Sequence, residues 1–344
     1  MPETEVPNTP SHARWRWWLW LPLLIIGVVL GTAYWALGPT HKAARVSIPR
    51  GAGAGAIGEI LENSGLVNSG EAFAWLAQAT GQDAGLRSGT FDLRGRGARE
   101  LLADISYRAQ PVTLRVVFPE GWRTIDIAQR LTARNLPGDE LLRLAQNLDS
   151  VRLPLKPPVA SLEGYLFPDT YFFAPEASAE EIAQAMVQKT ASVLTPEGRS
   201  QAEALGLTIH EWLTLASIVQ AESGNSSEMP WVAGVFLNRL EAGMPLQSDP
   251  TVAYALGKRM NALDRRLGDF SVDSPYNTYR IRGLPPTPIN SPSKEALLSV
   301  LNAQRTSPDG EPYLYFFHAN GEIYLNTDFA SHLQDLVSYS YSAE

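Results

Sequence analysis

One helix carries a glutamate whose position suits acid–base chemistry. Thr208, with Glu211 three residues later, forms a capping box that predicts a helix beginning at residue 208. Its apolar stripe has i, i+3, i+4, i+7 spacing and consists of Trp212, Leu215, Ala216 and Val219. Glu222 continues this stripe, and Gly224 marks the helix end. The carboxyl of Glu222 should therefore face the core in the last helical turn.

Such a position predicts a raised pKa for Glu222. Partial burial and the negative end of the helix dipole both disfavour the charged carboxylate. A raised pKa is what a general acid requires at neutral pH. The alternative is a glutamate that extends into solvent or pairs with a cation such as Arg239. Helix geometry alone does not separate the two.

Composition excludes several other kinds of site. The 344-residue chain is 44% apolar, has a formal net charge of −8 and contains no cysteine. No long run of Lys or Arg is present, so a nucleic-acid partner is not expected. The five histidines lack metal-binding spacing, and no phosphate-binding or dinucleotide motif occurs. We therefore expect neither a metal nor a cofactor.

The N-terminal region contains a long apolar stretch. Residues 17–37 carry no charge, and Arg14 and Arg16 precede them. At about 1.5 Å per residue, this stretch matches a bilayer of roughly 30 Å. It predicts a transmembrane helix at 17–37 that contacts the lipid bilayer, a cytosolic tail at 1–16, and a single-pass protein of the cytoplasmic (inner) membrane whose remaining chain lies outside. A cleaved signal peptide is the alternative.

A sequence echo follows the apolar stretch. Residues 46–51 and 116–121 share a strand-then-Pro/Gly pattern, and each copy continues into a helical pattern. Between the copies, the patterns predict a helix at 71–80, a strand at 89–93 and a helix at 98–106. Strand, turn and helix at this size are typical of a small α+β module. Chance is the alternative explanation for the repeat.

The C-terminal half is predicted to be mainly helical. A Pro-rich break at 153–158 suggests a boundary between segments at 42–157 and 158–340. Helices are expected at 178–195, 208–223 and 228–241, with a further helix that begins at Ser291 as N-cap. Asn320-Gly321 between two apolar runs predicts a small β-hairpin. The fold class is therefore α+β.

Motifs along residues 45–335 resemble the endolytic murein transglycosylase (YceG-like) family. In order they are Glu163–Tyr171, Ala216–Glu222, Val235–Leu240, Gly243–Val252, Tyr276–Tyr279, Gly283–Pro286, Ile289–Pro292, Tyr313–Phe316 and Asn326–His332. The resemblance implies a LysM-like module at 42–157, before a lysozyme-like catalytic domain at 158–340. It also implies peptidoglycan glycan strands as substrate and peptidoglycan synthases as partners.

The family's catalytic glutamate corresponds to Glu222. The resemblance implies a lyase that leaves 1,6-anhydro-N-acetylmuramic acid ends and so terminates strand elongation. An earlier glutamate of the family motif is Gln220 here, which puts any auxiliary role for a carboxylate there in doubt. The residues expected to bind substrate are Gln247, Asp249, Asn277, Thr278, Tyr279 and Glu163. Their alternative role is to form turns and a helix start.

Two other functions stay open at this point. A two-carboxylate hydrolase would place Asp249 or Glu163 about 5–9 Å from Glu222. A non-catalytic scaffold would bind peptidoglycan through the LysM-like part and recruit cell-wall synthases. A glutamate on a buried stripe favours an enzyme, because a scaffold does not need one.

Overall fold

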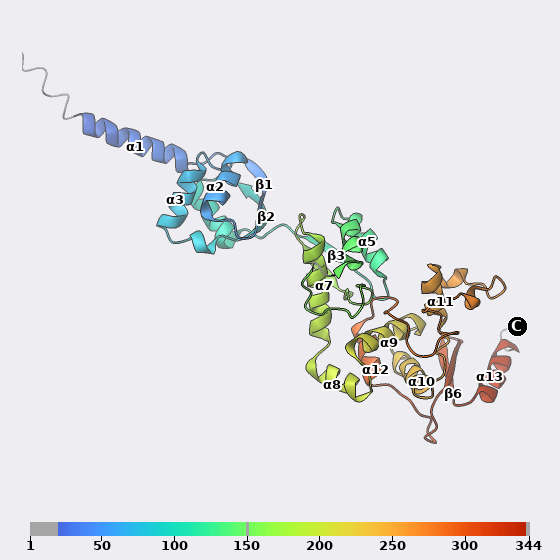
Figure 1. Cartoon of the computed structure of the whole chain (residues 1–344). Helices are drawn as coiled ribbons and strands as arrows, with labels where there is room; N and C mark the ends of the chain where they lie inside the picture. The colour runs from blue at the N-terminus through green and yellow to red at the C-terminus, as the bar shows by residue number, and fades with distance from the viewer. Residues whose placement is uncertain (1–19, 149–150, 342–344) are drawn as a thin grey trace, which may run out of the picture. The chain divides into compact units, whose positions relative to one another are not determined.

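The computed structural model describes residues 20–148 and 151–341, and it combines helices with small antiparallel sheets (Figure 1). The predicted α+β class is confirmed. Packing divides the chain into two units, Met1–Thr113 and Leu114–Glu344. Each unit has a hydrophobic core of its own.

The first unit follows the order strand, helix, helix, strand after an N-terminal helix. Its elements are α1 (Leu21–Leu37), β1 (Ala43–Ile48), α2 (Ala54–Asn63), α3 (Gly70–Ala79), η3 (Asp83–Gly85), β2 (Gly89–Arg94), α4 (Ala98–Ala103) and η4 (Asp104–Arg108). β1 and β2 pair antiparallel, with Val46 opposite Phe91. Gly58 and Gly70 let α2 and α3 approach closely, since a Cβ on Gly58 would lie 2.3 Å from the Gly70 carbonyl oxygen.

The predicted transmembrane helix at 17–37 is wrong. α1 has 17 residues. Across residues 20–148 and 151–341, none of the helices combines the length and apolarity needed to cross a membrane. This finding overturns the predicted inner-membrane location, and the structure does not show the predicted contact with a lipid bilayer. The predicted tail at 1–16 lies outside the described residues.

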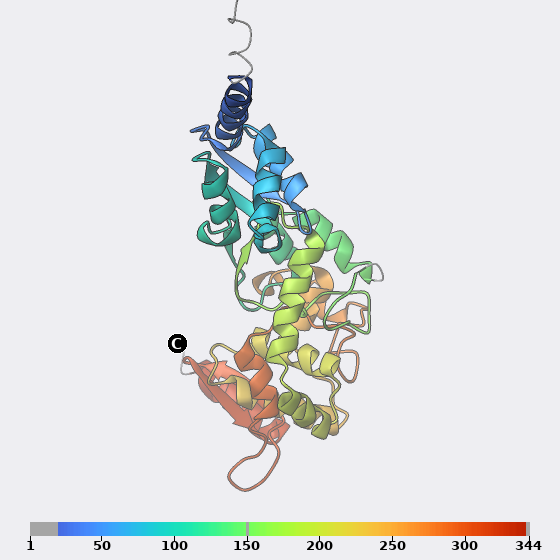
Figure 2. The ribbon, with the colours of Figure 1, turned by 90° about the vertical axis from the view of Figure 1, so that its left-hand side faces the viewer.

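The second unit surrounds α9 with other helices. Its elements are β3 (Leu114–Val117), α5 (Thr124–Thr132), α6 (Gly138–Ala145), β4 (Thr170–Phe173), α7 (Ala179–Val193), α8 (Pro196–Ala204), α9 (Ile209–Glu222), α10 (Met229–Glu241), α11 (Asp249–Leu256), η6 (Met260–Ala262), η7 (Asp269–Ser271), α12 (Lys294–Leu301), β5 (Tyr315–Ala319), β6 (Glu322–Asn326) and α13 (Phe329–Tyr341). α9 packs against α8, α10, α11 and α12. Figure 2 shows the β5–β6 hairpin and α13 at the C-terminal end of this unit.

α9 is buried more completely than its apolar stripe predicts. Its capping box between Thr208 and Glu211 is present, and every residue from 212 to 219 is buried. The indole nitrogen of Trp212 donates to the Leu297 carbonyl of α12 at 2.9 Å. The buried part of α9 therefore fixes the position of the helix, and the last turn, with Glu222, emerges from the core partly exposed.

The sequence echo is structural, but its two copies lie in different units. β1 with α2 forms the first copy, and β3 with α5 forms the second. β3 pairs with β4 at Leu114–Phe173, so residues 114–157 group with the second unit. The Pro-rich stretch at 153–158, where the sequence suggested a boundary, lies inside that unit.

The helix predicted to begin at Ser291 begins later. α12 starts at Lys294, and Ser293 is its N-cap, accepting from the Ala296 backbone at 3.0 Å. Both backbone groups of Ser291 are already used, because its N–H donates to Trp122 and its carbonyl accepts from Gly121. These bonds keep Ser291 outside the helix.

Candidate active site

Glu222 ends α9 beside the start of α11. The hydroxyl of Ser248 donates to Oε1 of Glu222 at 2.6 Å. Ser248 is fully buried, whereas Glu222 is partly buried. The Glu222 carboxyl therefore has one fixed side-chain donor.

The predicted raised pKa of Glu222 is confirmed. Its pKa is raised from 4.5 to about 7, mainly by burial, and the charge of Asp249 acts in the same direction. The Ser248 hydroxyl, the positive charge of Arg239 and the backbone N–H of Asp249 act in the opposite direction. A carboxyl with this pKa holds a proton in much of the population at neutral pH and can also release it.

Arg239 is near Glu222 but does not pair with it. Its guanidinium donates to the carbonyls of Leu314 at 2.7 Å and Leu246 at 2.8 Å. Among the described residues it forms no ion pair with Glu222. The alternative of a simple ion pair is therefore not what the structure shows. Arg239 joins α10 to the loop before α11 and to the start of the β5 hairpin.

Ser248 was not predicted from the sequence. It occupies the N-cap of α11, yet its side chain makes no capping bond. Leaving such a cap unmade costs about 1 kcal/mol. The backbone of Ser248 is held instead by two buried threonines: its N–H donates to Thr278 Oγ1 at 2.9 Å, and its carbonyl accepts from Thr251 at 2.7 Å. Its hydroxyl is thereby directed to Glu222. The sequence offered one indication of its role, because Ser248 lies between Gln247 and Asp249, which were both predicted to belong to the site.

Asp249 and Tyr279 lie next to this pair. The Tyr279 hydroxyl donates to Asp249 Oδ1 in a short hydrogen bond. Arg265 donates to the Tyr279 hydroxyl at 3.0 Å and lies 3.6 Å from Asp249. Burial and the bond to Asp249 raise the pKa of Tyr279 to about 12. The structure thus brings Glu222, Asp249 and Tyr279 together, as the sequence predicted.

Gln247 is the predicted binding residue with the most exposed position. It has a φ of 54°, and its N–H donates to the Thr278 carbonyl at 3.0 Å. A left-handed conformation is uncommon for residues other than glycine. Gln247 is exposed beside Ser248, where a sugar could reach it, and its Oε1 accepts from Arg239 Nη1 at 3.5 Å.

Asn277 and Thr278 do not fit the predicted contact with substrate. Both are fully buried. The Asn277 amide donates to the carbonyls of Phe270 at 3.0 Å and Val272 at 2.8 Å. Thr278 supports Ser248 as described above. Their polar groups are used within the protein, so these two residues shape the loop rather than face a ligand.

Glu163 is also buried, with 7% of its surface exposed. Its Oε1 accepts from the Thr124 backbone at 2.9 Å, and its Oε2 accepts from the Tyr254 hydroxyl at 3.3 Å. Burial raises the pKa of Glu163 to about 7, against the effect of these donors. The predicted substrate contact does not fit this enclosure.

Gln220 has a structural role that an amide fulfils. Its Oε1 accepts from the Ser293 backbone N–H at 2.9 Å, at the start of α12. Only an acceptor is required there, and an amide oxygen supplies one as a carboxylate would. The departure from the family motif therefore leaves the contact between α9 and α12 intact.

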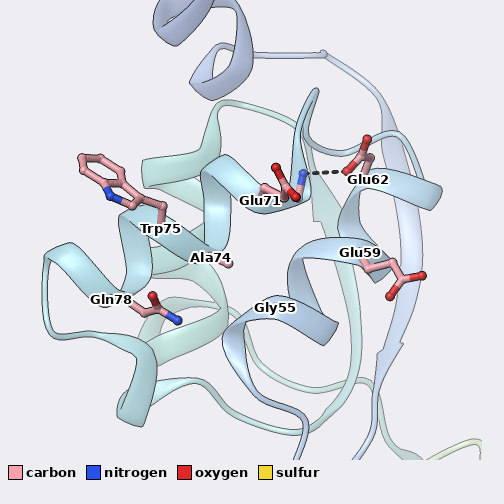
Figure 3. A pocket seen from close by; sticks show the side chains of 8 residues that line it. Gly55, Glu59, Glu62, Glu71, Ala74, Trp75 and Gln78 are labelled. Atoms are coloured by element: carbon pink, nitrogen blue, oxygen red, sulfur yellow. Dashed lines mark hydrogen bonds between the residues drawn. The ribbon is translucent and has the colours of Figure 1, made fainter.

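A separate pocket lies between α2 and α3 in the first unit (Figure 3). It has a volume of about 430 Å³ and is lined by Gly55, Glu59, Glu62, Gly70, Glu71, Ala74, Trp75 and Gln78. Glu62 of α2 accepts from the Gly70 backbone N–H of α3 at 2.7 Å, so this bond links the two helices that line the pocket. Trp75 is 65% exposed, which leaves its ring face available to a ligand.

Most of the chain is similar to known proteins. The model of the YceG-like family matches residues 46–337. A protein of Bacillus subtilis (strain 168) named endolytic murein transglycosylase is 30% identical over 334 residues, covering 90% of this chain and 89% of that protein. A protein of the same name from Streptococcus pneumoniae (strain D39) is 31% identical over 333 residues. That alignment covers 87% of this chain and 59% of the pneumococcal protein.

A solved structure is similar as well. The crystal structure of a yceG-like protein from Listeria monocytogenes aligns with a TM-score of 0.55 and 28% identity. The alignment covers 86% of this chain and 99% of that chain. The likeness therefore extends over both units of the fold.

Proposed function

Because this chain belongs to the YceG-like family, we propose that it is a lytic transglycosylase that cuts peptidoglycan glycan strands, with Glu222 as its acid and base. The names of the curated relatives support an enzyme of this class. The observation that carries the assignment to Glu222 is its partly buried carboxyl, with a pKa of about 7, bonded to Ser248.

The reaction requires only one carboxyl group. Protonated Glu222 donates its proton to the glycosidic oxygen as the bond to the N-acetylmuramic acid C1 breaks. The resulting carboxylate accepts the proton of that sugar's own 6-hydroxyl, whose oxygen bonds to C1 and closes a 1,6-anhydro ring. Proximity of the intramolecular hydroxyl replaces a water nucleophile. Ser248 stabilises the carboxylate that exists between the two proton transfers.

The remaining groups of the site have supporting roles in this proposal. Gln247 is exposed beside Ser248, and Tyr279 and Asp249 are partly exposed. Amide and phenol groups suit sugar hydroxyl and acetamido groups, so we assign these three residues to the glycan groove. Cuts inside a strand limit its length, and peptidoglycan synthases supply such strands. We therefore propose a role in ending strand elongation, with these synthases as partners.

A hydrolase is the second candidate, and Asp249 is the observation that favours it. The charge of Asp249 acts on Glu222, so the two carboxyl groups are close enough to interact. A two-carboxylate glycosidase uses such a pair to activate water or to form a covalent intermediate. Its products would end in a reducing sugar instead of an anhydro ring.

The pocket of the first unit supports a glycan-binding role for that unit. An exposed tryptophan with polar neighbours is typical of a surface on which sugar rings stack, and Trp75 has this setting. The strand–helix–helix–strand order agrees with the proposed LysM-like module. A scaffold without catalysis would use this pocket alone.

Mass spectrometry of soluble fragments tests these alternatives. The full chain and its Glu222→Gln variant are incubated with purified, uncross-linked glycan strands. Ends in 1,6-anhydro-N-acetylmuramic acid from the wild type only are the expected result. Reducing ends would establish the hydrolase. Strand binding without any fragment release would contradict catalysis and favour the scaffold.

A further inference from the structure

A basic segment lies beside the candidate acid in an otherwise acidic protein. Between residues 258 and 282 there are six cations, Lys258, Arg259, Arg265, Arg266, Arg280 and Arg282, against three anions, Asp264, Asp269 and Asp273. The whole chain has a formal net charge of −8. The segment runs from the end of α11 through η7 to Tyr279, so it brings local positive charge to the site.

Arg265 is the cation of this segment that contacts the site. Its Cζ lies 3.8 Å from the centroid of the Phe270 ring and 5.2 Å from that of Tyr279. The two rings meet edge to face, with centroids 5.1 Å apart and an interplanar angle of 86°. Two rings at right angles restrict the guanidinium plane and reduce the entropy that ligand binding would cost.

Most hydrogen-bond donors of Arg265 remain available. A guanidinium has five N–H groups, and among the described residues the Arg265 guanidinium makes one hydrogen bond, from Nη2 to the Tyr279 hydroxyl. It also forms an ion pair with Asp249 at 3.6 Å, a separation too long for a hydrogen bond, so this contact uses none of its N–H donors. The side chain is 62% exposed. A planar set of donors thus reaches solvent next to the site.

The contacts from Arg265 lead directly to Glu222. Arg265 pairs with the Asp249 side chain, and the charge of Asp249 acts on the Glu222 carboxyl. A group bound by Arg265 is consequently attached close to the sugar being cut. In peptidoglycan, the muramyl sugar carries a lactyl group, and the peptide attached to it carries free carboxylates.

We propose that Arg265 binds a carboxylate of the muramyl substituent and so determines which sugar lies at Glu222. That carboxylate is one in the attached peptide or, where the peptide has been removed, the freed lactyl carboxylate. This inference rests on the proposed function for the identity of the strand. A guanidinium pairs well with a carboxylate because two parallel N–H donors match two oxygens. Arg265 is therefore a specificity-determining residue for the same site.

Binding to two forms of one strand tests this proposal without relying on cleavage. Fluorescently labelled soluble strands are used either unchanged or after conversion of their carboxylates to methylamides. Fluorescence anisotropy then gives the Kd of the full-length Glu222→Gln protein for each form. We expect amidation to weaken binding about tenfold, as for the loss of one charge-assisted hydrogen-bonded pair.

Variants at two neighbouring arginines identify the residue. In the Glu222→Gln background, Arg265→Gln should weaken binding of unmodified strands about tenfold, and amidation should then change the Kd less than twofold. Arg266→Gln removes an exposed cation from the same loop and should keep the tenfold response to amidation. Arg265→Lys retains the charge and should recover part of the affinity, which a purely structural role would not predict.

The outcomes separate this proposal from the proposed function. Equal binding of native and amidated strands by the Glu222→Gln protein would overturn it. So would an Arg265→Gln variant that loses affinity equally for both strand forms. A charge-dependent affinity that requires Arg265 supports it even if the wild type releases no fragments, in which case only the catalytic assignment fails.

Strands without peptides identify the source of the carboxylate. An amidase that removes the peptides leaves the lactyl carboxylate free on each muramyl sugar. Retained affinity that still depends on Arg265 shows that it binds the freed lactyl carboxylate of stripped strands. A tenfold loss on peptide removal, absent in Arg265→Gln, assigns a carboxylate of the peptide. Either result supports the proposal and names its ligand.

Discussion

Glu222 and Glu163 are two carboxyl groups of the second unit whose pKa is raised to about 7 by burial. Each accepts a hydrogen bond from a hydroxyl, Ser248 for Glu222 and Tyr254 for Glu163. Their surroundings differ. Glu222 ends a helix beside partly exposed polar residues, whereas Glu163 is enclosed and bonded to the backbone at the start of α5.

This difference shows that a perturbed pKa alone does not identify an acid. Burial raises the pKa of any carboxyl that lacks sufficient compensation, whether or not a substrate can reach it. Whether a substrate can reach the carboxyl, and which hydrogen-bond donors contact it, decides between a catalytic and a structural role. Substitutions at the two sites therefore test whether the comparison holds.

The largest expected difference comes from replacing each glutamate by glutamine. Glu222→Gln removes the only proton donor and acceptor of the proposed reaction, so the rate of fragment release should fall roughly 1000-fold or more. Glu163→Gln should keep the rate within about threefold, because its carboxyl does not face the substrate. Fragment release measured by liquid chromatography compares the two. Equal losses would mean that Glu163 takes part in catalysis.

The pH dependence of the reaction should follow Glu222. Its carboxyl must be protonated to act as an acid, so kcat/KM should decline above about pH 7. A decline of about tenfold per pH unit gives roughly a 100-fold loss by pH 9. Initial rates on soluble strands between pH 5 and pH 9 provide the profile. A rate that keeps rising through pH 9 would exclude a neutral-range acid.

Removing the hydroxyl that bonds each glutamate should change the pH dependence of activity at one site and not at the other. Ser248→Ala should lower kcat/KM about tenfold. Because the Ser248 bond lowers the pKa of Glu222, its loss should also move the alkaline decline upward by about one pH unit. Tyr254→Phe removes the equivalent donor from Glu163 and should leave the decline where it is. A shift in the Tyr254→Phe variant would show that the two sites are linked.

The smallest effect on activity, but a measurable effect on stability, is expected for Glu163→Gln. The folded-state pKa of Glu163 is raised from 4.5 to about 7, so the folded protein keeps a proton that the unfolded chain loses. Stability from this group is therefore present below about pH 4.5 and is lost as pH rises to about 7. Relative to the wild type, the variant should gain roughly 2 kcal/mol in unfolding free energy between pH 5 and pH 8. Urea titrations at both pH values measure this difference.

Sequence patterns predicted local structure well where short-range rules apply. The capping box at Thr208, the buried stripe that leads to Glu222, and the hairpin around Asn320 all depend on residues a few positions apart. These features follow from hydrogen-bond and packing periodicities that operate within one element. The prediction that Asp249 and Tyr279 belong to the same site as Glu222 came instead from the family resemblance of their motifs.

The sequence by itself determined the family, the α+β class and the glutamate at the end of α9. Tertiary structure alone decided which polar residues face the site. Ser248 turns its hydroxyl to Glu222 on α9, while Thr278 holds its backbone N–H from 30 residues away. Asn277 turns inward because the carbonyls of Phe270 and Val272 in the preceding loop accept from its amide. Side-chain direction at such positions depends on partners up to about 30 residues away, which no local pattern encodes.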